Sequence, residues 1–124
     1  MPYTVVVDDE LIRVAFSGTA TGTDLRAMAT EVQAIERARP TIPNRLIDLT
    51  DMVATGMLFR LTLNLARGRR VEQFPNSFKS AILAPTADTA RFARMFQQLN
   101  TNPQIDVQVF ATLERAEAWL RAKD

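Results

Sequence analysis

The chain has 124 residues, of which 47% are hydrophobic and 23% are charged, and this composition is typical of one globular domain. Its formal net charge is +1, which is too small to predict a nucleic-acid partner, because such binding needs several clustered cations. The sequence contains no cysteine and no histidine. These absences exclude disulfides, Cys or His zinc sites and every Ser-His or Cys-His catalytic pair.

No apolar run approaches the roughly 20 residues that span a bilayer, and the start "MPYTVVVDDE" has no basic region followed by an apolar stretch. We therefore expect a cytoplasmic protein without a transmembrane segment. No repeat, low-complexity tract or linker interrupts the sequence. A single domain over residues 1–124 is expected.

The first elements predicted are two strands, at residues 4–7 ("TVVV") and 11–17 ("LIRVAFS"), joined as a hairpin. In the second strand Ile12, Val14 and Phe16 share one face, because side chains alternate along a strand. We expect this face to meet the core.

Apolar residues at helical spacing predict a helix over residues 24–38. Thr23 is its expected N-cap, and Asp24 suits the first turn near the positive end of the helix dipole. Pro40 and Pro43 end the helix, and residues 45–49 ("RLIDL") return as a strand that leads into a polar turn.

The rest of the chain continues the alternation of helix and strand. We expect helices at residues 56–72, 87–99 and 113–122 and strands at 79–84 and 106–110. Two further sets of side chains are predicted to pack inward, and Thr112 to cap the last helix. The two sets are Phe92, Met95, Phe96 and Leu99, and Leu113, Ala116, Trp119 and Leu120.

Alternation with short connections indicates right-handed crossovers on a largely parallel sheet. The initial hairpin adds an antiparallel edge. The fold class expected is therefore α/β, with a mixed sheet of about five strands and about four helices.

Several segments in this order resemble the STAS domain of anti-sigma-factor antagonists, and more closely its SpoIIAA-like, or STAS/SEC14-like, branch. They are "VAFSG", "LIDLTDMVATGM", "SAILAP", "ARFARMFQQL" and "VQVFATLERAEAWL". The resemblance covers nearly all of the chain. It implies a SpoIIAA-like fold and a regulatory or protein-interaction role without enzymatic activity.

In anti-sigma-factor antagonists a turn of the form Asp-Ser-Ser-Gly-Leu carries a serine that a partner kinase phosphorylates. The resemblance places Thr55 at this position and retains Gly56, whereas Val53 and Ala54 replace polar residues. Thr55 is therefore a candidate phosphoacceptor, and a helix cap is the alternative interpretation. The partner-binding residues that the resemblance implies are Asp51, Met52, Val53, Ala54, Gly56, Met57 and Leu58.

Asp48 and Asp51 invite one further interpretation, as a carboxylate pair for acid-base work or metal binding. The chain has no histidine to complete such a site, and Asp48 falls within a strand of alternating pattern. We therefore expect no catalytic residue, no metal and no cofactor.

The apolar residues at 57–65 cover more of the expected helix than one sheet face requires. Neighbouring elements, a second copy in a homodimer, another protein, or a lipid or apolar ligand are the alternatives for covering them. Arg67, Arg69 and Arg70 follow, and they suit the negative end of the helix dipole. The other interpretation is contact with an anion or lipid headgroup, in which Lys79 extends the cluster.

Overall fold

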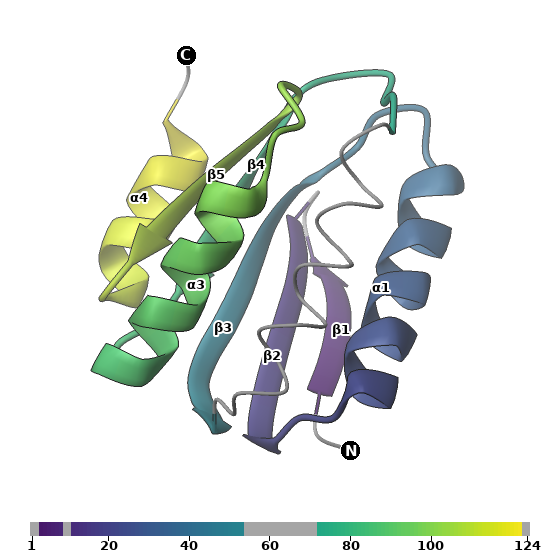
Figure 1. Ribbon diagram of the computed structural model, residues 1–124. Helices are drawn as coiled ribbons and strands as arrows, with labels where there is room; N and C mark the ends of the chain where they lie inside the picture. The colour runs from purple at the N-terminus through teal and green to yellow at the C-terminus, as the bar shows by residue number, and fades with distance from the viewer. Residues whose placement is uncertain (1–2, 9–10, 54–71, 123–124) are drawn as a thin grey trace.

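The computed structural model describes residues 3–8, 11–53 and 72–122. Five strands form one sheet in the order β1-β2-β3-β4-β5. β1 pairs with β2 antiparallel, and the remaining neighbours are parallel. The strands are β1 (Tyr3–Asp8), β2 (Leu11–Thr19), β3 (Asn44–Val53), β4 (Phe78–Leu83) and β5 (Ile105–Phe110), and the helices are α1 (Gly22–Arg37), α3 (Ala87–Leu99) and α4 (Leu113–Arg121) (Figure 1).

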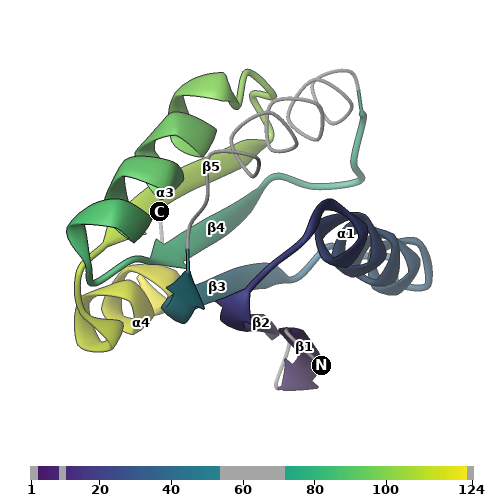
Figure 2. The same cartoon turned by 60° about the horizontal axis from the view of Figure 1, so that its bottom comes forward.

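The helices lie on both faces of the sheet: α1 and α3 cover one face, and α4 covers the other (Figure 2). This arrangement confirms the predicted α/β class, the mixed sheet of five strands and the antiparallel hairpin at its edge. Three helices fall within the described residues. The helix predicted at residues 56–72 lies outside them, apart from Glu72, which is not helical.

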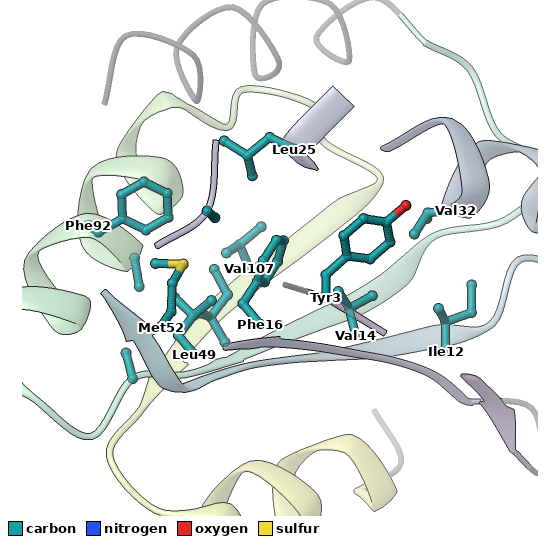
Figure 3. Packing of buried hydrophobic residues seen from close by; sticks show 14 of the residues in the cluster. Tyr3, Ile12, Val14, Phe16, Leu25, Val32, Leu49, Met52, Phe92 and Val107 are labelled. Carbon is teal, nitrogen blue, oxygen red and sulfur yellow. The ribbon is translucent and has the colours of Figure 1, made fainter. Parts of the chain in front are cut away.

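The main core lies between the sheet and the helices α1 and α3 (Figure 3). The predicted inward face of β2 is confirmed, since Ile12, Val14 and Phe16 are 0%, 1% and 4% exposed. Val32 of α1 and Phe92 of α3 are buried above them. This layer also contains the predicted Phe96, which is only half-buried.

A smaller core lies under α4, where Ala116 packs with Leu46, Ala81 and Leu83. The predicted inward orientation of Leu113 is wrong, because its side chain is 44% exposed. Residues four apart share a helix face, and Glu117, one turn after Leu113, contacts Arg13 of β2. Leu113 therefore lies on the partly exposed flank of α4 that also carries Glu117, and not in the core under α4.

Helix α1 begins two residues earlier than the sequence predicted, with Thr21 and not Thr23 as its N-cap. The Thr21 hydroxyl accepts the N–H of Asp24 at 3.2 Å, and the Asp24 carboxylate accepts the N–H of Thr21 at 2.8 Å. This reciprocal capping box needs an acceptor three residues after the cap, which Asp24 supplies to Thr21. The predicted cap at Thr112 is confirmed for α4.

Candidate functional site: the carboxyl end of β3

Strand β3 continues to Val53, so residues 51–53 lie in the sheet and not in the polar turn that the sequence predicted. The pairing with β2 continues through Ser17↔Asp51, Gly18↔Met52 and Thr19↔Val53. Gly18 has a φ of 67°, a left-handed conformation that glycine adopts without steric cost. β2 can therefore extend past the glycine and supply backbone partners for the end of β3.

A bulge precedes this end of β3. Ala15 pairs with Asp48 and Ser17 pairs with Asp51, so β3 has one more residue than β2 between the two pairs. The Asp48 carboxylate accepts the Thr50 backbone N–H at 2.8 Å and the Thr50 hydroxyl at 2.5 Å. Asp48 thus helps to hold the bulge in shape, which is a structural role.

The bulge determines which side chains the end of β3 presents. Asp51 is exposed, Met52 is 6% exposed and belongs to the core, and Val53 is 53% exposed. Thr19, which pairs with Val53, is also exposed. The strand end therefore offers an exposed valine beside a carboxylate and a hydroxyl.

The remaining predicted members of this site fall outside the described residues. They are Ala54, Thr55, Gly56, Met57 and Leu58, together with Arg67, Arg69 and Arg70. Lys79, which the alternative interpretation added to the arginine cluster, is 7% exposed. Its ammonium group donates to the carbonyls of Trp119 at 3.0 Å and Ala122 at 2.8 Å. Lys79 therefore supplies hydrogen bonds to carbonyl groups at the end of α4.

An apolar cavity of about 80 Å³ lies among the sheet, α1 and α3. Its walls include Phe16, Met28, Leu49 and Phe92, and Arg45 is the charged residue among the described ones that line it. Pockets for drug-sized ligands have volumes of roughly 300–1,000 Å³. The cavity as formed has room for only a small apolar group.

Arg45 belongs to a buried ion pair that sequence reasoning missed. Its guanidinium group donates to the carboxylate of Glu36, the two residues are 7% and 4% exposed, and the guanidinium lies 4.7 Å from the centre of the Phe78 ring. A signal for this pair is present in the sequence. Arg45 alternates with Ile47 and Leu49 on the same face of β3, and Glu36 lies on the same buried face of α1 as Val32.

The described part of the chain contains no group of three side chains suited to hold a metal ion. Within residues 3–8, 11–53 and 72–122, none of the helices is long and apolar enough to cross a bilayer.

Comparison with known proteins gives the family. Among solved structures, an uncharacterized protein of the DUF3478 family from Shewanella loihica PV-4, with a SpoIIAA-like fold, matches with a TM-score of 0.62 and 16% identity, over 95% of this chain and 91% of that chain. This likeness concerns the fold. No curated protein matches the sequence significantly. A sequence profile described as SpoIIAA-like matches residues 11–121, and the chain therefore belongs to the SpoIIAA-like family.

Proposed function

We propose that this protein is a non-enzymatic regulatory module that binds a protein partner through residues 51–58. The observation that carries the proposal is the exposure of Val53. This valine is 53% exposed and lies at the carboxyl end of β3, which pairs in parallel with β2. It lies beside the exposed Asp51 and Thr19. The carboxyl ends of parallel strands are where open α/β sheets commonly bind their ligands, and the SpoIIAA-like family supports a partner-binding surface at this end of β3.

Phosphorylation of Thr55 is the regulatory step that we propose for this surface. Thr55 follows Val53 by two residues, and the family resemblance supports it as phosphoacceptor. A phosphate carries about −1.5 to −2 charges at neutral pH. The phosphate would add to the negative charge of Asp51 and would repel acidic groups of a partner that packs on Val53. Burying the phosphate in that contact would also carry a desolvation cost.

The test of this step is phosphorylation in vitro by kinases encoded beside the gene, followed by mapping of the phosphate. The proposal expects one modified residue, Thr55, and none in a Thr55→Val variant. Modification elsewhere, or none, contradicts it. Thr55→Glu must also keep the cooperative unfolding transition of the wild type, since loss of the fold would make Thr55 a structural residue.

A second candidate function, binding of a small apolar ligand or lipid, is favoured by the cavity beneath α1 and α3. Arg67, Arg69 and Arg70 would then contact a phosphate or headgroup. The volume of about 80 Å³ argues against an acyl chain unless the cavity widens. Mass spectrometry of an organic extract of the purified protein, with thermal stability measured in added lipid, tests this candidate; a clean extract and an unchanged Tm contradict it.

A further inference from the structure

Strand β1 forms one edge of the sheet, and β2 is the one described strand that pairs with it. Residues 3–7 read "YTVVV" and contain no charge, glycine or proline. Edge strands normally carry charged residues, prolines or bulges that prevent pairing with another chain. The opposite edge, β5, carries an exposed charge at its second residue, Asp106, whereas the exposed charge of β1, Asp8, lies at its last residue.

The exposure of β1 fits an edge that is open for pairing. Val6 is 54% exposed, the largest exposure among the big apolar side chains of the described residues. Val5 and Val7 point toward the core and remain half-buried rather than buried. Valine-rich strands have high β-propensity, so this edge is suited to accept a further strand.

We propose that two copies of this chain pair antiparallel through β1, with Val6 opposite Val6 of the second copy on a two-fold axis. An antiparallel pair must keep each face of the sheet matched, because side chains alternate along both strands. In this register Val5 of one copy lies opposite Val7 of the other, and Thr4 of one copy lies opposite Asp8 of the other. A hydroxyl then meets a carboxylate, and no like charges oppose each other. A two-fold axis at Val5 would instead oppose Thr4 to the exposed Val6.

The flank of α1 above the edge leaves room for the second copy. The Tyr3 hydroxyl donates to Glu31 at 2.8 Å, which places this flank of α1 beside β1. Ala27 and Ala34, one turn before and after Glu31, are exposed alanines. Small side chains on a helix flank allow the corresponding helix of a second copy to approach without a clash. The backbone edge and the helix flank therefore point to the same occupant.

The absence of cysteine in the sequence allows a direct test in the full-length protein. The change is Val6→Cys, and the matched control is Gln108→Cys in β5, an exposed position on the other edge. Residues opposite each other in an antiparallel pair have Cα atoms about 4.5–5.5 Å apart, within reach of a disulfide. Mild oxidation should link Val6→Cys into a covalent dimer at least about tenfold faster than Gln108→Cys.

A second measurement uses Val6→Lys, which opposes two ammonium groups on the two-fold axis. Val6 is exposed, so the monomer fold tolerates this change. Sedimentation should show a wild-type dimer and at least about a tenfold weaker one for Val6→Lys, and Gln108→Lys should match the wild type. A wild type that sediments as a monomer at every concentration, or equal cross-linking of the two cysteine variants, overturns the proposal.

Discussion

The carboxylate of Glu36 and the guanidinium of Arg45 form an ion pair inside the protein, under the ring of Phe78. One partner comes from the last turns of α1 and the other from the start of β3. The pair thus joins the two ends of the connection from helix to strand. It also places a charged group in the wall of an otherwise apolar cavity.

Removing one member of this pair should destabilise the protein strongly. Glu36→Gln removes the carboxylate to which the buried guanidinium donates, at a cost of about 3–5 kcal/mol in the free energy of unfolding. Glu36→Leu combined with Arg45→Met should cost less, because both charges of this pair are removed together. Urea denaturation of the single and double variants measures the difference. A double variant that is less stable than Glu36→Gln would contradict this account.

Gln104 should matter more than an ordinary surface glutamine. Its amide accepts the Phe74 N–H at 2.8 Å and donates to the Phe74 carbonyl at 2.8 Å, so it holds the segment before β4. Gln104→Ala leaves both backbone groups without this partner, at about 1–3 kcal/mol. Gln108→Ala is the control, since Gln108 is exposed, and should change stability by no more than about 0.5 kcal/mol. Equal effects of the two substitutions would refute the assignment.

Lys79 should determine whether α4 stays docked. Its ammonium group binds two carbonyls at the end of α4 and lies 5.1 Å from the centre of the Trp119 ring. Lys79→Met keeps the apolar stem and loses these contacts, at about 2–3 kcal/mol. Trp119 is the single tryptophan, so its fluorescence reports on α4. Arg121→Met, which removes an exposed cation from the same helix, should leave both fluorescence and stability nearly unchanged.

The single tyrosine of the chain should titrate above its ordinary range. The hydrogen bond to Glu31 raises the pKa of Tyr3, and burial and the charges of Glu31 and Asp24 add to the effect. The stabilisation that follows from this raised pKa is therefore fully present below the pKa of about 10 that Tyr3 has in the unfolded chain. It is lost as the pH rises through the pKa of Tyr3 in the folded protein.

Ultraviolet absorbance follows this ionisation without interference from other tyrosines. Glu31→Gln should lower the pKa of Tyr3 toward its ordinary value. Tyr3→Phe should remove the part of the alkaline loss of stability that depends on this group. An unchanged pKa in Glu31→Gln would contradict the role given to the hydrogen bond.

Much of the fold follows from residue pattern. The alternation in β2 identified Ile12, Val14 and Phe16 as core, and the spacing in α3 identified Phe92. Helix starts were harder to predict, because Thr21 and Thr23 are equally good caps by residue type. The position of Asp24 three residues after Thr21 decides between them.

The candidate site was harder to predict for a physical reason. The polar residues Thr50 and Asp51 favoured a turn. In the structure β2 and β3 continue to pair beyond a bulge, in which Asp48 accepts a hydrogen bond from the Thr50 N–H. Such a bulge depends on pairing between distant segments and leaves little local signal. The Glu36–Arg45 pair was missed because charged residues are usually assigned to the surface.

The most direct test of the proposed function uses a photo-crosslinking residue in place of Val53, with Gln108 as the control position. In cells of the source organism, the crosslinker at position 53 should capture one protein that position 108 does not capture, and Thr55→Glu should reduce that capture at least about tenfold. Capture of the same proteins from both positions, or capture that Thr55→Glu leaves unchanged, would contradict recognition and switching at this edge.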